Sequence, residues 1–522
     1  LEGSGALDLV PSDLVAGLVM LQKVQKQRVR EYRRAIEDEK RDRKNGPPTL
    51  QQNDSDLQCL EVGENSAFLM LRVPDDEERD SRNLYEARER NLFDETNNMD
   101  KKLIAEGAHF ARYALAIYGR IFYKHPLIGF ARLLGRRVSE ICHQGEVSET
   151  TVTGDNFLHL RKNSVLAQAG LDGSELVYAN FRNKFSQTPY CIVVDRAWKS
   201  VVLSIRGTLS LEDVVVDVTM DPEPLDELAR QYGFDNAQGQ HCHHGVLECV
   251  KTIVKDLESH KLLESLLVGE TGAAKYPDYN LQIVGHSLGA GCAALLGHLL
   301  KSKFPGLRVS AFSPPGCLFS HKLAIECSDF VTSFVLDSDI VPRLSVTNME
   351  HLRDDVLSLI GRIKVPKMRV AKVHACLFVP GKTKKAKDPD AMAEELHEIL
   401  HPENAVPTDT NFHRELEAFK TIQKDRRQER GAYREVDLYL PGRVCHLVKT
   451  KRRLDRKGKF ARSCCSCCTK DTDYEYTAVW AENSDFNEIL VSSSMIINHF
   501  PHRMCAELER IAETFGVDAL SV

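Results

Sequence analysis

The motif GHSLG at residues 285–289 has the residue types and the spacing that nucleophilic catalysis by a serine requires. The apolar residues 281–284 before it are typical of a buried strand, and the alanines and leucines of 290–300 are typical of a helix packed on a sheet. Between them the chain must turn within about two residues, which strains the backbone at Ser287. The Ser287 hydroxyl is therefore expected to stand at the tip of a sharp turn.

Glycines and backbone donors around this turn are the next requirement. Gly285 and Gly289 lack the β-carbons that would collide with the strand and the helix. The N–H of Leu288 lies at the N-terminus of the expected helix, where it can point at a developing oxyanion. A second donor is predicted at Thr208, because residues 204–210 (SIRGTLS) end a strand in Gly-Thr. An ordinary turn is the alternative for that stretch.

An acid that orients the base is also needed, and it should follow a later strand. In hydrolases with this kind of turn the chain order is serine, then acid, then histidine. Asp339 follows the strand-like residues 330–336 and is the predicted acid. Asp337 is its competitor and could equally cap the end of the strand.

The base is expected in a loop near the C-terminus. His499 follows the β-like residues 488–493 and precedes a C-terminal helix pattern, so its position suits a loop base. His502 is close enough to compete, although its position is less favourable. Three further histidines lie in an apolar run or on or near a charged helix and fit the role less well: His374, His397 and His401.

The elements that would position these side chains alternate between strand and helix patterns. Residues 190–208 form two β-rich runs joined by a short polar turn and predict a hairpin. Alternation of strands and helices predicts an α/β fold, a largely parallel sheet in three layers with the active residues at the carboxyl ends of the strands. The alternating runs are strands at 281–284, 308–313 and 330–336 and helices at 246–267 and 291–300.

A chain of 522 residues exceeds one ordinary domain, so a catalytic core with additions is predicted. The expected divisions are an N-terminal helix and charged linker at 1–100, a helical segment packing on the core at 101–155, the first part of the core at 156–347, a partly disordered insertion or regulatory loop at 348–483, and a C-terminal core segment carrying the base at 484–522.

Composition limits the partners. The net charge of −6, with both signs interspersed, gives no global electrostatic basis for binding nucleic acid. Fifteen cysteines without a framework of spacings favour reduced thiols in a cytosol-facing protein. Four of the cysteines form two adjacent pairs just after the basic run 449–462, and a tetrahedral metal site made from these four alone is sterically awkward. A surface loop, either plainly solvated or S-acylated, is predicted there for Cys464, Cys465, Cys467 and Cys468.

Apolar runs, and stretches that mix apolar and basic residues, indicate which parts of the chain could contact a membrane. No run approaches about 18 apolar residues, so no transmembrane helix is predicted within the chain. The chain begins with Leu1 rather than Met and shows no signal-peptide pattern, so a preceding segment is expected. Residues 123–137 mix apolar and basic residues and could touch a membrane, although a helix packed in the fold is favoured. Residues 211–233 suit a mobile cover over an apolar cleft, or an ordinary surface helix and loop.

Several motifs together resemble a known family. RGT at 206–208, HG at 244–245, GHSLG at 285–289 and DIVPRL at 339–344 match, in order and rough spacing, the class 3 lipases of the fungal type. The resemblance is closer still to the sn-1-specific diacylglycerol lipases. That closer likeness is carried by stretches at 8–22 (DLVPSDLVAGLVMLQ), 209–225 (LSLEDVVVDVTMDPEPL) and 495–501 (MIINHFP).

The resemblance implies an α/β-hydrolase-type three-layer sandwich with N-terminal helices and a large insertion before the catalytic histidine. Ser287 would be the nucleophile, Asp339 the acid and His499 the base, with Thr208 and Leu288 as oxyanion donors. The implied reaction is hydrolysis of the sn-1 ester of diacylglycerol, giving a 2-monoacylglycerol of the 2-arachidonoylglycerol type and a fatty acid. Other glycerolipids, as for a phospholipase A1, and a catalytically silent membrane-associated scaffold are the alternatives.

The same resemblance implies a location and a cation. The chain would act at the cytosolic face of a membrane, the plasma membrane in particular, after a bundle of membrane spans. Activity would be stimulated by calcium, and the insertion would act as a regulatory loop over the site. No calcium loop of recognisable spacing is present in the sequence. Asn498 also departs from the family, which has an acidic residue at this position.

Overall fold

The computed structural model describes residues 9–45, 92–119, 151–153, 165–166, 169–170, 175–183, 187–208, 222–234, 237–269, 274–366, 369–370, 389–402, 412, 414–419, 421–422, 436–451 and 474–518. Four features singled out in the sequence lie outside these ranges: the cysteine doublets at 464–468, residues 123–137, His374, and the first part of the expected cover, 211–221.

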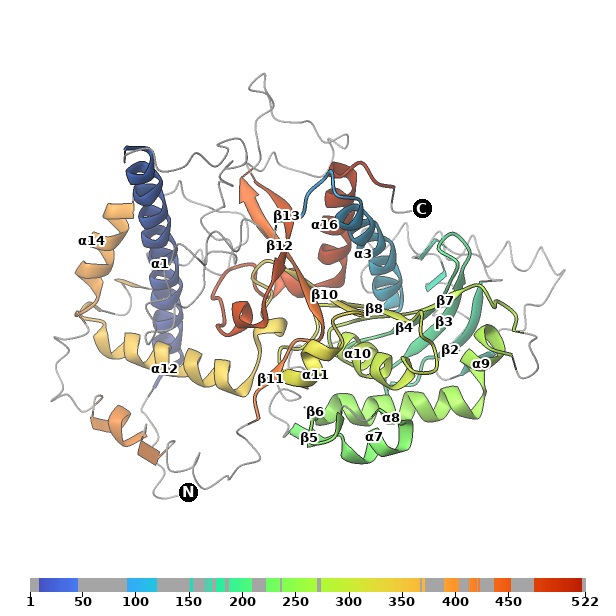
Figure 1. Cartoon of the computed structure of the whole chain (residues 1–522). Coiled ribbons are helices and arrows are strands. Elements are labelled where there is room, and N and C mark those ends of the chain that lie inside the picture. Colours follow the sequence, from blue (N-terminus) through green and yellow to red (C-terminus); the bar gives the residue numbers. More distant parts are fainter. Residues whose placement is uncertain are drawn as a thin grey trace, which may run out of the picture.

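A nine-stranded sheet forms the centre of the molecule (Figure 1). Its central strands run parallel, and an antiparallel pair closes one edge. The expected hairpin is present, since β3 and β4 pair antiparallel. In spatial order the strands are β1 (Thr151–Thr153), β2 (Leu176–Asn180), β3 (Tyr190–Asp195), β4 (Ser200–Ile205), β7 (Asn280–His286), β8 (Arg308–Phe312), β10 (Val331–Leu336), β12 (Arg443–Lys451) and β13 (Tyr474–Ala481).

Helices cover both faces of this sheet (Figure 1). On one face α8 (His244–Ser259) and α10 (Leu288–Leu300) pack in a core with the side chains of β4 and β7. On the other face α3 (Asn98–Ala116) and α16 (Pro501–Thr514) share a second core with the opposite side of the strands. Because both faces are covered, the central strands read as continuous apolar runs rather than alternating ones. The predicted three-layer α/β fold is confirmed.

The helix predicted over 246–267 is two helices in the structure. The first, α8, ends at Ser259, and α9 (Leu262–Leu267) begins after a break. Lys261 at the break has φ 47°, a left-handed conformation that cannot continue a right-handed helix. The amphipathic pattern continues across the break because α9 also turns an apolar face, Leu263 and Leu266, to the core.

A second, four-stranded sheet lies beside α8 and α11 (His321–Glu326). Its strands are β11 (Leu438–Tyr439), β9 (Phe319–Ser320), β6 (His241–His243) and β5 (Pro222–Pro224). The described part of the expected cover contributes β5 and α7 (Asp226–Tyr232), which buries Leu228 and Ala229. This part of the stretch is therefore packed against the fold.

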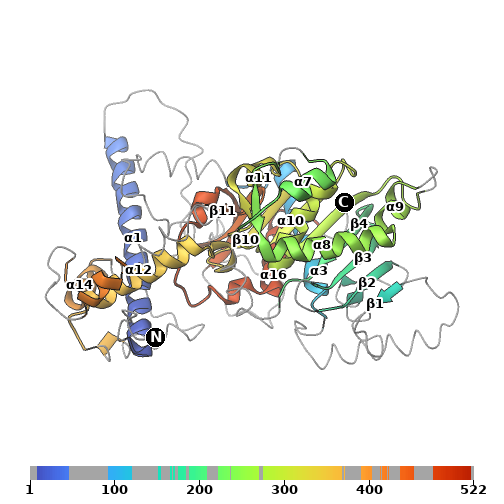
Figure 2. The same ribbon diagram turned by 90° about the horizontal axis from the view of Figure 1, so that it is seen from below.

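Three helices stand together at one end of the main sheet in both views (Figures 1 and 2). They are α1 (Pro11–Asn45), α12 (Val346–Arg362) and α14 (Pro389–Ile399), called here the three-helix unit. The unit has its own apolar core, which includes Met20 of α1, Leu359 of α12 and Ile399 of α14. None of the helices built from the described residues combines the length and the apolar character that crossing a bilayer needs.

The region expected as an insertion, 348–483, contributes to two parts of the fold. Its first part supplies most of α12 and all of α14, which belong to the three-helix unit. Its last part supplies β12 and β13, which are strands of the main sheet, with β12 parallel to β10. The sheet therefore extends two strands beyond β10 before the chain reaches His499.

Candidate active site

Ser287 occupies a sharp turn between β7 and α10. Its backbone has φ 59° and ψ −131°, a conformation that L-residues adopt only under strain. A β-carbon on Gly285 would lie 2.1 Å from the carbonyl oxygen of Gly289, and one on Gly289 would lie 2.4 Å from that of Ile205. Strand and helix can approach this closely only because both positions are glycine.

His499 lies between Ser287 and Asp339. Its Nε2 is 3.1 Å from Ser287 Oγ, and its Nδ1 is 3.1 and 3.2 Å from the two carboxylate oxygens of Asp339. Since Nδ1 faces a carboxylate, Nδ1 carries the proton and Nε2 is left to accept from the serine hydroxyl. All three side chains are buried, with Asp339 0% exposed. The arrangement can deprotonate the serine as it attacks an electrophile.

The structure separates the two candidate acids. Asp339 faces His499 and also accepts a hydrogen bond from the Val341 N–H at 3.0 Å. Asp337, the competitor, is buried with φ 47°, and its carboxylate accepts from Asn498 Nδ2 at 3.3 Å. Asp337 thus holds the loop, while the carboxylate beside His499 is that of Asp339.

The other candidate histidines lie elsewhere. His502 is on the first turn of α16, where its ring stacks on Phe500 with centroids 5.8 Å apart. His397 is exposed on α14, as expected. His401 follows α14, and its carbonyl accepts a hydrogen bond from Arg362 at 3.0 Å. Among these described histidines, the one brought to Ser287 is His499.

A buried hydrogen-bond chain behind the serine was not foreseen from the sequence. His286 donates from Nε2 to the carbonyl of His499 at 2.7 Å, so its Nδ1 accepts from the Tyr118 hydroxyl at 2.9 Å. That hydroxyl in turn accepts from the Gly207 N–H at 3.2 Å. Burial, and after it the nearby His499, lower the pKa of His286 well below its ordinary value, so this imidazole stays neutral. Tyr118 follows α3 by two residues, and no local motif marks it.

The predicted oxyanion donors meet beside the serine. A β-carbon on Gly207 would lie 3.0 Å from Ser287 Cβ, so the end of β4 runs against the turn. Thr208 follows directly, and its hydroxyl is buried without a hydrogen-bond partner in the described part of the chain. Leu288 is the first residue of α10, where N–H groups have no partner within the helix. Thr208 and Leu288 therefore both lie beside Ser287 in the fold.

Asn498 stands where an acidic residue was expected, and its surroundings explain the difference. It is fully buried, and its Nδ2 lies 3.3 Å from both Asp337 Oδ2 and Ser338 Oγ. A carboxylate here would face that of Asp337 without the N–H donors that the amide supplies. The amide therefore suits this loop, and it removes nothing from the Ser287–His499–Asp339 set.

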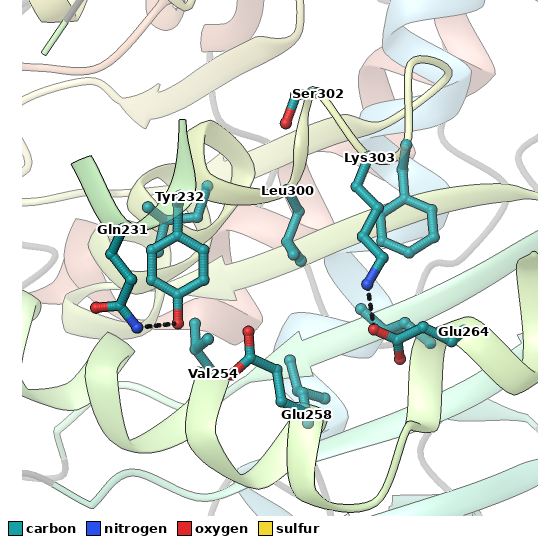
Figure 3. A pocket seen from close by; sticks show the side chains of 12 residues that line it. Gln231, Tyr232, Val254, Glu258, Glu264, Leu300, Ser302 and Lys303 are labelled. Atoms are coloured by element: carbon teal, nitrogen blue, oxygen red, sulfur yellow. Dashed lines mark hydrogen bonds and ion pairs between the residues drawn. The ribbon is translucent and has the colours of Figure 1, made fainter. Parts of the chain in front are cut away.

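No metal site is apparent in the described ranges, where no group of three or more His, Cys, Asp or Glu side chains could hold an ion. A pocket of about 320 Å³ lies between α7, α8, α9 and the end of α10 (Figure 3). Lys303 and Glu264, which both line it, form an ion pair, and the Tyr232 hydroxyl accepts a hydrogen bond from the neighbouring Gln231 at 3.3 Å. Its lining includes neither Ser287 nor His499, so this hollow is separate from the triad.

The fold and this geometry define a class of protein. A serine at a strand-to-helix turn of a mostly parallel sheet, with an acid and a histidine from loops after later strands, is the arrangement of the α/β hydrolases. Both the strand order and the positions of Ser287, Asp339 and His499 follow that arrangement.

Comparison with known proteins narrows the class. Residues 202–349 match the family model described as lipase (class 3). The chain is 31% identical to diacylglycerol lipase-beta of Mus musculus, over 77% of this chain and 56% of the relative. It is 28% identical to diacylglycerol lipase-alpha of Homo sapiens, over 98% of this chain and 42% of the relative. The resemblance found in the sequence is confirmed, and the chain spans about half the length of these relatives.

Among solved structures, a lipase from Rhizopus microsporus var. chinensis is similar, with a TM-score of 0.33 and 18% identity. The match covers 56% of this chain and 79% of that one.

Proposed function

We propose that this chain is the catalytic part of a serine lipase that hydrolyses the sn-1 ester of diacylglycerol, giving a 2-monoacylglycerol and a fatty acid. The observation that carries the proposal is the hydrogen-bonded set in which His499 lies 3.1 Å from Ser287 Oγ and 3.1 Å from Asp339. The names of the relatives, diacylglycerol lipases alpha and beta, support the substrate.

The geometry suits a two-step acyl transfer. Ser287 Oγ attacks the ester carbonyl while His499 Nε2 takes its proton, and Asp339 stabilises the imidazolium that forms. Thr208 and the Leu288 N–H stabilise the oxyanion. The C–O bond to glycerol then breaks, and His499 returns the proton to the departing glycerol oxygen. Water, deprotonated by the same imidazole, hydrolyses the acyl-enzyme and restores Ser287.

The setting of the reaction belongs to the proposal. A diacylglycerol substrate places the enzyme at a membrane surface, and the resemblance supports the cytosolic face of the plasma membrane. The chemistry needs no cofactor, because nucleophile, base, acid and oxyanion donors are all protein groups. Calcium stimulation is supported by the resemblance alone, and no step of the reaction is assigned to calcium.

The test is fatty-acid release from each glycerol position in vesicles that contain diacylglycerol. Replacing the nucleophile in Ser287→Ala should lower turnover by about six orders of magnitude, as for other serine hydrolases. Ser310→Ala is the matched control, because Ser310 is buried in the neighbouring strand β8 and bonds to Gln282 rather than to the triad. It should keep turnover within a few-fold.

Retention of most activity by Ser287→Ala would refute the assigned nucleophile. If Ser287 reacts with a fluorophosphonate probe while diacylglycerol is untouched and phospholipid is cleaved, the enzyme is a phospholipase A1. If Ser287 reacts with no probe and no lipid is cleaved, the chain is a catalytically silent scaffold.

A further inference from the structure

The N-terminal helix α1 reaches the segment that leads into the catalytic-histidine loop. Gln25 of α1 is 1% exposed and makes three hydrogen bonds to residues 488–491. Its Nε2 donates to Glu488 Oε1 and to the carbonyl of Ile489, both at 3.0 Å, and its Oε1 accepts from the Val491 N–H at 3.0 Å. Both donors and the acceptor of the amide are used, across more than 460 residues of sequence.

The hydrogen bonds from Gln25 to the backbone of residues 489–491 resemble those that a neighbouring strand would make. Residues 489–492 have no regular secondary structure, so their backbone groups need partners from elsewhere. The Gln25 amide binds the carbonyl of Ile489 and the N–H of Val491, two positions on, and so fixes the register of this segment as a paired strand would. Arg28, one turn further along α1, pairs with Glu488 at 2.5 Å.

The same segment is held from the side of the acid loop. Arg343, four residues after Asp339, donates from Nη1 to the carbonyls of Glu488 and Asp485 at 3.2 and 2.8 Å. The segment around Glu488 therefore lies between α1 and the acid loop, and a change in the position of α1 acts on it directly.

Hydrogen bonds connect this segment to the loop that carries His499. Ser492 Oγ lies 2.7 Å from Ser338 Oγ, and the Met495 carbonyl accepts from the Ile340 N–H at 3.2 Å. The Asn498 N–H then bonds to the Ser494 carbonyl at 2.7 Å, one residue before His499. A shift of the segment would displace His499 relative to Ser287, and displacements of about 1 Å can cost about 100-fold in rate.

We propose that Gln25, assisted by Arg28, is a positioning residue that sets the catalytic-histidine loop, so that the contact of α1 with residues 488–491 controls turnover. The proposal rests on the role given to His499 under Proposed function. Gln25 touches neither the serine nor the base, and it acts through residues 488–491.

The test compares Gln25→Met with Lys23→Met in the full chain. Gln25→Met keeps an unbranched buried side chain of similar length and removes the three hydrogen bonds. Lys23→Met removes a contact of the same helix that faces away from the loop, the 2.7 Å ion pair with Glu395 of α14. Two readouts are used, backbone amide exchange over residues 488–500 and the kinetics of a soluble short-chain ester.

In Gln25→Met, amide exchange over 488–500 should rise about tenfold, and kcat should fall about tenfold with KM nearly unchanged, because the base is misplaced while binding is not. Lys23→Met should leave both readouts within about twofold. Wild-type exchange and kcat in Gln25→Met, or an equal loss in Lys23→Met, would overturn the proposal.

If Gln25→Met does not fold, Arg28→Met gives the answer, because Arg28 is about one-third exposed and its pairing with Glu488 is the ion pair that it forms with the described residues. Faster exchange over 488–500 supports the proposal, and unchanged exchange refutes it. If the wild-type chain cleaves no ester yet Gln25→Met speeds exchange there, the hold of α1 on the loop stands and the proposed function fails.

Discussion

Burial and hydrogen bonding together determine the protonation state of a side chain next to Ser287. His286 shows this, since it is 2% exposed and its imidazole links the Tyr118 hydroxyl to the carbonyl of His499. A protonated His286 would carry a charge in an apolar interior and could no longer accept from Tyr118. Neutrality of this residue is therefore part of the site.

Stability should depend on pH through His286. Its pKa is lower in the folded protein than the value of about 6.5 expected in the unfolded chain, so the unfolded chain binds more protons below that pH. Stability is therefore lost as the pH falls through about 6.5 and toward the folded-state pKa. Between about pH 7.5 and about pH 5.5, the wild type should lose about 1.4 kcal/mol more free energy of unfolding than His286→Gln.

The measurement is urea unfolding of both proteins at the two pH values. Glutamine keeps a donor and an acceptor at this position and does not titrate, so groups common to both proteins cancel in the difference. If the free energy of unfolding falls by the same amount in both proteins, His286 does not take up a proton on unfolding and the prediction is wrong.

Individual site residues could be predicted from the sequence where each follows a recognisable strand or precedes a recognisable helix. The turn at Ser287, the loop after β10 and the loop before α16 each follow a recognisable element, so Ser287, Asp339 and His499 formed one predicted set, and the structure brings them together. Tyr118 and Gln25 were missed because their partners lie far away in the sequence, and no local pattern reports such a pairing.

Among the elements, the contact of β7 with α10 depends on the absence of two side chains. The helix begins one residue after Ser287, and it passes so close to β7 and β4 that backbone atoms occupy the places of both missing β-carbons. Such a junction has no flexible side chain that could move aside.

Gly285→Ala should therefore destabilise the protein by about 3 kcal/mol, because the added carbon would lie 2.1 Å from the Gly289 carbonyl oxygen. Gly239→Ala is the control. Gly239 has φ 71° with open space around its Cα, so alanine there adds only backbone strain of about 1 kcal/mol. Thermal or urea unfolding compares the two, and a cost for Gly285→Ala no larger than that of the control would contradict the close junction.

Element types were predicted better than element boundaries. The hairpin β3–β4 and the strands β7, β8 and β10 have strong apolar runs with clear ends, and all are present. The break at Lys261 was missed because amphipathic periodicity does not report a single left-handed residue. Strands β12 and β13 lie at the end of the region expected as an insertion, 348–483, whose charged composition hides them, yet they complete the sheet.

Three large apolar cores in the described part of the chain organise the molecule. Two lie on the faces of the main sheet, and the third holds α1, α12 and α14 together with Val491 of the segment before His499. Val491 brings the segment before His499 into the third core, so loss of packing within this core should be felt near the site.

Met20→Ala tests this arrangement. Met20 is fully buried in the third core, and its truncation should cost about 3 kcal/mol in the seating of α1. Leu14→Ala on the same helix is the control, because Leu14 is 46% exposed and its loss should cost less than about 0.5 kcal/mol. Limited proteolysis should cut α1 first in Met20→Ala; cutting at the same rate in both variants would contradict the third core.

The hold of Gln25 on residues 488–491 has a consequence for the order in which the protein is made. The helix is synthesised early, and its buried partners follow more than 460 residues later. At translation rates of about 5–20 residues per second, α1 waits on the order of half a minute or more for them. Until then the Gln25 amide lacks these partners and forms its hydrogen bonds with water instead. The contact of α1 with this segment therefore forms only after residues 488–491 have been made, and activity is expected only after it.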